Sequence, residues 1–136
     1  MFGILVVAHG DLANLFLDTA KKILGEECPA ASAFPIAWDA DFSAVKKSLE
    51  KTLKKMKESN HSVLVLTDLF GGTPTNLAMT FYEKGKVEIV TGINLPLLIK
   101  ALLIQKNGVE MDDALQELRS KAQEAIVLVS EVMEGR

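Results

Sequence analysis

Short apolar runs alternate with longer amphipathic segments along this chain. Four of the runs have the length of strands: residues 2–8, which are rich in Ile and Val, residues 62–67 and 87–90, and a weaker run at residues 31–38. Continuous runs of this kind are typical of strands that are buried on both faces. The last apolar run, AIVLVSEV at residues 125–132, predicts a fifth strand.

The segments between these runs have apolar residues at helical spacing. Asp11 and Gly25 mark the start and the end of the first predicted helix, and Pro74 suits the first turn of the third. Further helices are predicted from Ser43 through a lysine-rich stretch to about residue 57, from Pro74 to about Lys84, over 97–105 and over 111–124.

Strands that alternate with helices predict a parallel sheet, because parallel neighbours need crossover connections that bring the chain back. Such a sheet carries helices on both faces, so the predicted fold class is α/β. The sequence shows no internal repeat and no linker composition. We therefore expect one domain over residues 1–136.

The composition of the chain bears on its cellular location and on the classes of partner that it could bind. The chain is 49% hydrophobic with a formal net charge of −3, which does not favour nucleic acid as a partner. Cys28 is the one cysteine, so no internal disulfide can form. The apolar stretch 95–104 contains Pro96 and Lys100 and is too short to span a bilayer, and no secretory pattern opens the chain. A soluble, cytoplasmic protein that is not inserted in a membrane is expected.

Polar residues follow three of the predicted strands directly. His9-Gly10-Asp11 follows the first strand, residues 68–73 follow the third, and residues 91–96 follow the fourth. In an open parallel sheet the carboxyl ends of the strands share one edge, and ligands bind there. We expect these three loops to form the candidate site.

His9 in that position could be a general base, a metal ligand or a nucleophile. The other histidine, His61, precedes the third strand and belongs to the opposite edge, so we expect no metal. A GxSxG turn, which a hydrolase of this class would use, does not occur in the sequence. Asp68 is placed to hold one imidazole nitrogen and leave the other free to take up a phosphoryl group. The alternative is that His9 bonds a backbone carbonyl and Asp68 closes a turn.

The stretch GGTPTN, residues 71–76, suits an anion that lies close to the backbone. Gly71 and Gly72 permit close approach, Thr73 can cap the helix that follows, and the hydroxyl of Thr73 or Thr75 can donate to a phosphoryl oxygen. The three loops contain no lysine or arginine, which favours a carrier that passes the group on over a tight nucleotide binder. We expect no cofactor.

Three motifs together resemble a known family. VVAHGD, TDLFGGTPTN and TGINLPLL, in this order, are similar to the IIA component of the mannose-type sugar phosphotransferase system. The resemblance implies that Nε2 of His9 accepts a phosphoryl group from the phosphocarrier HPr and passes it to a IIB component, while Nδ1 bonds Asp68. It also implies a doubly wound sheet and a homodimer in which a strand at about residues 125–133 adds to the partner's sheet.

The resemblance also assigns roles around His9. Thr73 matches a hydroxyl position that contacts the phosphoryl group, with Gly72 beside it, and Phe70 matches a position that flanks the histidine. Gly10, Gly71 and Asn94 complete the flanking residues, and a structural role in its loop is favoured for Asn94. Trp38 is compatible with the core or with the edge of the site.

Two departures from the family pattern bear on this reading. Leu69 stands where some relatives carry a hydroxyl, and the sequence ends at Arg136 without a fused IIB domain. A separate IIB acceptor is therefore expected. The alternatives to a transport phosphocarrier are a regulatory phosphohistidine module and a binding protein that is not phosphorylated. The related dihydroxyacetone-kinase branch shares the early histidine but fits GGTP and GINLP less well.

Overall fold

The computed structural model describes residues 1–28 and 30–135. Its sheet consists of β1 (Phe2–His9), β2 (Ala31–Ile36), β3 (Ser62–Thr67) and β4 (Val87–Val90) in the order β2-β1-β3-β4. All three neighbouring pairs are parallel. The predicted parallel α/β architecture is confirmed.

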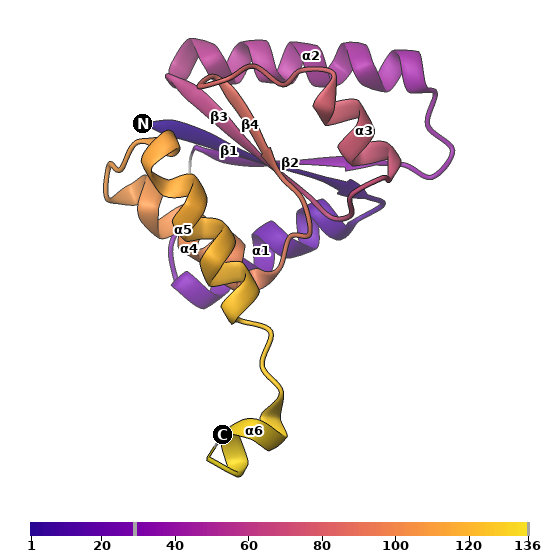
Figure 1. Ribbon diagram of the computed structural model, residues 1–136. Coiled ribbons are helices and arrows are strands. Elements are labelled where there is room, and N and C mark those ends of the chain that lie inside the picture. The colour runs from indigo at the N-terminus through magenta and orange to yellow at the C-terminus, as the bar shows by residue number, and fades with distance from the viewer. Residues whose placement is uncertain (29, 136) are drawn as a thin grey trace.

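Helices cover both faces of this sheet, as a doubly wound fold requires (Figure 1). The helices are α1 (Leu12–Leu24), α2 (Phe42–Ser59), α3 (Thr73–Met79), α4 (Leu95–Lys106), α5 (Met111–Glu124) and α6 (Val129–Met133). Helices α2 and α3 lie over one face, and α1, α4 and α5 lie on the other. Within the described residues, no helix is long and apolar enough to cross a membrane.

The alternation of side chains along β1 divides the core into two layers. Ile4 and Val6 pack toward α1, α4 and α5, whereas Leu5 and Val7 pack toward α2 and α3. All four side chains are fully buried. Because successive strand residues point to opposite faces, a continuous apolar run serves both layers, which is why the pattern of residues 2–8 predicted this strand correctly.

Two elements end earlier than the sequence pattern suggests. β2 ends at Ile36, because Ala37 begins a turn in which the amide of Ala40 donates to the carbonyl of Ala37. α3 ends at Met79 and not near Lys84. The hydroxyl of Thr80 donates to the carbonyl of Leu77 at the end of this helix, and the chain then turns back toward β4.

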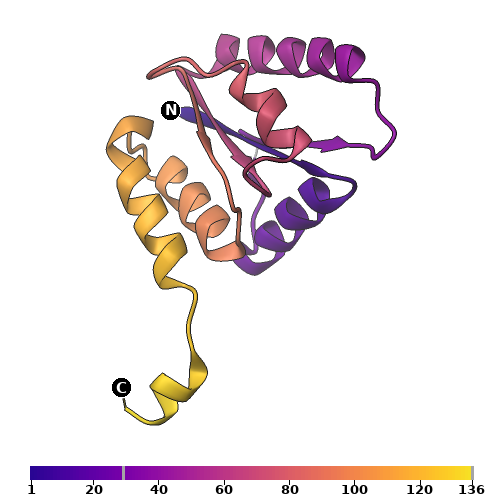
Figure 2. The same cartoon turned by 45° about the vertical axis from the view of Figure 1, so that its right-hand side comes forward.

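The predicted fifth strand is wrong for the chain as the structure has it. After α5, residues 126–128 have no regular structure and α6 follows at Val129–Met133. Figure 2 shows this segment projecting away from the sheet and its helices. A strand needs a neighbour for its backbone hydrogen bonds, and no strand of the described residues pairs with this segment. Its apolar side chains, including Ile126 and Val129, are exposed.

The strand order reverses direction between β1 and β3. From β1 the chain crosses to β2 on one side, and from β3 it crosses to β4 on the other. The carboxyl ends of β1 and β3 therefore flank the position where strand order reverses, which is where open α/β sheets bind ligands. His9 ends β1, and Asp68 directly follows β3.

Candidate functional site

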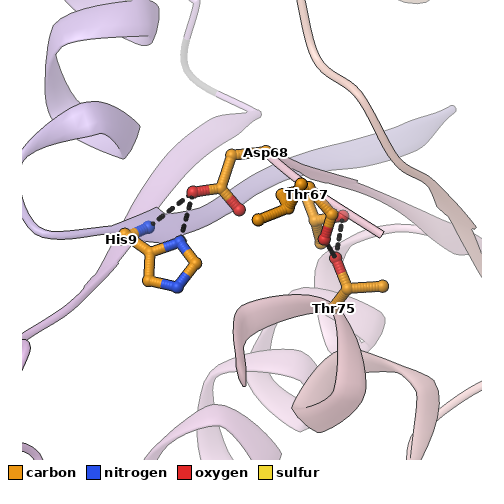
Figure 3. Close-up of polar contacts among 5 residues, drawn as sticks. His9, Thr67, Asp68 and Thr75 are labelled. Atoms are coloured by element: carbon orange, nitrogen blue, oxygen red, sulfur yellow. Dashed lines mark hydrogen bonds and ion pairs between the residues drawn. The ribbon is translucent and has the colours of Figure 1, made fainter. Parts of the chain in front are cut away.

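His9 and Asp68 meet at this reversal point. Val7 pairs with Thr67 across the sheet, so the two chains leave their strands side by side. Oδ2 of Asp68 accepts hydrogen bonds from the backbone amide of His9 at 2.9 Å and lies 2.7 Å from its ring Nδ1 (Figure 3). Because a carboxylate can only accept, Nδ1 carries the proton and Nε2 keeps its lone pair. The predicted contact is present in the structure.

The charge of Asp68 is directed at His9 alone among the described residues. No described lysine or arginine forms an ion pair with this carboxylate. Its second oxygen, Oδ1, is buried and has no hydrogen-bond partner in the described part of the chain. The carboxylate therefore faces the Nδ1 edge of the imidazole ring without a competing ion pair from the described residues.

A buried pair of hydroxyls holds the loop that carries Asp68. Oγ1 of Thr67 lies 2.6 Å from Oγ1 of Thr75, and the Thr75 hydroxyl donates to the carbonyl of Leu69 at 2.5 Å. Both threonines are fully buried. Figure 3 shows these contacts beside the His9–Asp68 pair. The Thr75 hydroxyl proton is thus used within the loop and cannot be donated to an anion. Of the two candidate hydroxyls, Thr73 remains as the possible donor to a phosphoryl oxygen.

Gly72 lies next to the imidazole ring, and Thr73 lines the cavity beside it. A Cβ atom at Gly72 would approach Cε1 of His9 to 3.0 Å and Nε2 to 3.6 Å, so the absence of a side chain lets this backbone pack against the ring. Gly72 occupies the N-cap position of α3, and Thr73 is the first helical residue rather than the cap that the sequence suggested. Thr73 and His9 line one cavity of about 180 Å³.

Trp38 also lines that cavity. Its indole is stacked on the imidazole of His9, with ring centroids 4.9 Å apart and planes inclined by 23°. Gly10, with φ of +53°, makes room, since a Cβ there would lie 3.1 Å from the indole Nε1. The sequence did not decide whether Trp38 belongs to the core or to the site. The pairing of β1 with β2 decides it, because His9 pairs with Ile36, two residues before Trp38.

The other predicted flanking residues lie around a different cavity or in the loop. Phe70 and Asn94 line a groove of about 640 Å³ beside β4 and α5, not the cavity at His9. The Asn94 side chain caps α4 by accepting from the amide of Leu97 at 2.8 Å, and it donates to the carbonyl of Ala122 at 3.1 Å. Gly71 has φ of +90°, a conformation that favours glycine in the turn before α3.

Groups elsewhere in the chain do not join this site. No set of three or more His, Cys, Asp or Glu side chains within residues 1–28 and 30–135 could hold a metal ion. His61 directly precedes β3, at the opposite ends of the strands. Burial raises the pKa of the Cys28 thiol, and Glu26 and Glu27 act in the same direction against the effect of Lys21. Cys28 therefore stays protonated and weakly nucleophilic at neutral pH.

The arrangement suits a ring nitrogen that accepts an electrophile. The Asp68 contact fixes the tautomer, so Nε2 is nucleophilic. A group bonded to Nε2 leaves the proton on Nδ1 and makes the ring cationic, and the carboxylate then stabilises that cation. The His9 side chain is 20% exposed, which leaves access from solvent or from a protein partner.

The chain is similar to known proteins of one family. The family model described as PTS system fructose IIA component matches residues 3–119. The fructose-specific EIIA component of Bacillus subtilis (strain 168) is 30% identical over 135 residues, which cover 98% of this chain and 90% of that protein. The mannose-specific EIIAB component of Escherichia coli (strain K12) is 27% identical, and the match covers 81% of this chain and 34% of that longer protein.

Solved structures show the same fold. The crystal structure of the PTS IIA protein associated with the fucose utilization operon from Streptococcus pneumoniae is similar, with a TM-score of 0.85 and 31% identity. That match covers 97% of this chain and 96% of the pneumococcal chain. The chain therefore belongs to the mannose-type IIA family of the sugar phosphotransferase system, whose members are phosphotransferase components.

Proposed function

We propose that His9 is the phosphorylated residue of this phosphocarrier and that its Nε2 atom accepts and releases the phosphoryl group. The observation that carries this proposal is the 2.7 Å contact between Nδ1 of His9 and Oδ2 of Asp68. It holds the imidazole in the nucleophilic tautomer and supplies the negative charge that a cationic phosphoimidazole needs. Asp68 acts through His9 and does not itself touch the transferred group.

Gly72 and Thr73 are proposed to receive the phosphoryl oxygens. Support comes from their positions: the Gly72 backbone packs against the Cε1–Nε2 edge of the ring, and Thr73 lines the same cavity as His9. The Thr73 side chain is exposed, so its hydroxyl is free to turn toward a group on Nε2. With neutral donors only, the site stabilises the group while it is carried and does not trap it.

The proposed partners are HPr as donor and a separate IIB component as acceptor, in a cytoplasmic setting. The relatives are named for fructose, mannose and sorbose, although they share this domain. A carrier that handles only the phosphoryl group and two proteins does not contact the sugar, which accounts for this variety. The chemistry at His9 is therefore expected to be the same whichever sugar the system takes up.

A homodimer is proposed from two features of the chain: the open edge of β4 and the exposed apolar segment that follows α5. β4 is an edge strand, and the groove along it is lined by Glu88, Ile89 and Val90 together with Ile126. Residues 126–129 expose apolar side chains, and no described strand lies beside them. An unpaired apolar segment and an open sheet edge complement each other in two copies of the chain.

The dimer is tested by light scattering coupled to size exclusion. The full chain should elute with the mass of two copies, and a variant with Ile126→Asp and Leu128→Asp should have the mass of one. Phe42→Ser removes a comparably exposed apolar side chain remote from this segment and serves as the control. A wild-type chain that remains monomeric at high micromolar concentration contradicts the proposal.

The carrier function is tested by intact-mass analysis without acid treatment. The chain is incubated with phosphoenolpyruvate, enzyme I and HPr, and a gain of one phosphoryl group is expected. His9→Ala should show no gain, whereas His61→Ala should match the wild type. Addition of a IIB component should remove the group. A phosphoryl group that persists in the His9→Ala protein would show that another residue is the carrier.

A further inference from the structure

Trp38 occupies a position that apolar burial does not explain. The residue is 82% exposed, yet its indole is stacked on His9 at a centroid distance of 4.9 Å. An indole ring that packs to satisfy the hydrophobic effect would be removed from water over most of its surface. The contact with His9 is therefore the feature that distinguishes this side chain.

The backbone on both sides fixes Trp38 in that place. The amide of Gly10 donates to the carbonyl of Ile36 at 2.8 Å, which ties the end of β1 to the end of β2. The turn from Ala37 to Ala40 then carries the indole over the end of β1. A side chain at position 10 would crowd the indole Nε1, because its Cβ would lie at 3.1 Å. Gly10 and the turn thus build the place in which the indole lies.

We propose that Trp38 is a positioning residue that holds the plane of the His9 ring and stabilises the positive charge that this ring carries while it is phosphorylated. The inference rests on the proposed function of His9. It assigns a second source of stabilisation to the phosphorylated state, on the ring face, beside the carboxylate of Asp68 at the ring edge.

The chemistry of the transfer shows why a stacked indole matters. The lone pair of His9 Nε2 forms a bond to phosphorus, while the bond between phosphorus and the donor's nitrogen breaks and its electron pair returns to the donor ring. The proton on Nδ1 stays in its hydrogen bond to Asp68, so the product is a cationic imidazole that bears a phosphoryl group. A cation within about 6 Å of the centroid of an indole face is attracted by the ring quadrupole.

The stack and the Gly72 backbone restrain the ring from different sides. Asp68 bonds Nδ1, Gly72 packs at the Cε1–Nε2 edge, and the indole covers one face. Rotation of the imidazole about its bond to Cβ would break the first contact and lose the third. The direction of the Nε2 lone pair is therefore fixed, and His9 lines a cavity that Thr73 also lines.

An exposed tryptophan could instead serve only as a contact for the donor protein, and an equilibrium measurement separates the two roles. A side chain that contacts the donor only within the complex changes the forward and reverse rates by the same factor. One that stabilises the phosphorylated ring changes the equilibrium between free phosphorylated donor and free phosphorylated chain.

The experiment compares Trp38→Leu, Trp38→Phe and the wild type, with Tyr82→Leu as the control. Tyr82 is an exposed aromatic residue, 56% exposed, that does not line the cavity at His9. Each full-length chain is equilibrated with a limiting amount of phosphorylated HPr, and the phosphorylated fraction of both proteins is read by intact mass. Trp38→Leu should lower the equilibrium constant about twofold to fivefold. Trp38→Phe should recover part of this loss, and Tyr82→Leu should equal the wild type.

A spectroscopic readout checks the contact without any phosphoryl transfer. The ring current of the indole should shift the His9 Cε1 and Cδ2 proton signals, which His61→Gln separates from those of the second histidine. Trp38→Leu should remove this shift and Tyr82→Leu should keep it. Trp38 is the single tryptophan of the sequence, so its fluorescence should also change when His9 is phosphorylated.

The outcomes distinguish a failure of the proposed role of His9 from a failure of the proposed role of Trp38. A wild-type chain that takes no phosphoryl group from HPr overturns the proposed function and this inference together. A phosphorylated wild type whose equilibrium constant equals that of Trp38→Leu overturns the inference alone. The same holds if Trp38→Phe is no better than Trp38→Leu, because an aromatic face would then have no role.

Discussion

One oxygen of Asp68, Oδ2, holds His9 by two atoms, the backbone amide at 2.9 Å and the ring Nδ1 at 2.7 Å. The first bond fixes where the end of β1 lies relative to β3, and the second fixes the orientation and tautomer of the ring. Backbone geometry and ring chemistry are thus joined in a single acceptor. A substitution at Asp68 can be chosen to keep the shape and remove the charge.

Asp68→Asn is expected to leave the fold intact and slow phosphoryl transfer to His9. The amide oxygen can still accept from His9, but the negative charge that stabilises a cationic ring is lost. A hydrogen bond to a charged group contributes about 1.5–3 kcal/mol, which corresponds to a rate reduction of roughly 10- to 100-fold. Rapid-quench measurement of transfer from phosphorylated HPr gives this rate.

Asp11→Asn is the matched control for that loss of charge. Asp11 lies two residues after His9, is exposed, and makes no side-chain hydrogen bond at the start of α1. Its substitution should leave the transfer rate near that of the wild type. Equal reductions in the two variants would mean that general charge near the site, and not the Asp68 contact, supports transfer.

Gly72→Ala is expected to impair transfer much more than folding. The added Cβ would lie 3.0 Å from Cε1 of His9, so the ring or the loop must move by a few tenths of an ångström. Because φ at Gly72 is −84°, alanine meets no backbone strain there. Transfer kinetics and urea unfolding, measured on the same preparation, check both parts. A normal transfer rate would show that close approach at Gly72 is not needed.

Thr75→Val is expected to lower the free energy of unfolding by about 1–3 kcal/mol, because the Leu69 carbonyl and the Thr67 hydroxyl lose a buried partner. Urea unfolding of Thr67→Val, Thr75→Val and the double variant forms a double-mutant cycle. The double variant should be less destabilised than the sum of the two, since the hydroxyl contact can be lost only once. Strict additivity would show that the two hydroxyls do not stabilise the loop together.

Asn94→Ala is expected to destabilise the fold by about 1 kcal/mol, since the side chain caps α4. It also loses the hydrogen bond to Ala122, which connects this loop to α5. Asn107→Ala, at the other end of α4, removes the same amide without a side-chain hydrogen bond and should have little effect. Thermal unfolding compares the two, and equal stability of both variants would assign Asn94 no capping role.

The order of elements from β1 to α5 and the meeting of His9 with Asp68 followed from the sequence alone. Buried parallel strands read as continuous apolar runs, and their carboxyl ends share an edge, so the residues that end one strand and follow another must be neighbours. Gly25 located the end of α1 and Pro74 located the start of α3, both for local reasons. Where such a marker was absent, as after Met79, helical spacing alone extended α3 too far.

Tertiary structure decided the rest, because side-chain direction depends on contacts between segments far apart in the chain. Nothing local distinguishes Thr73 from Thr75, yet packing against Thr67 buries one hydroxyl and leaves the other at the surface. Trp38 reaches His9 only through the register between β1 and β2. The C-terminal run has the composition of a strand, but a strand forms only beside a paired neighbour, and among the described residues no strand pairs with that run.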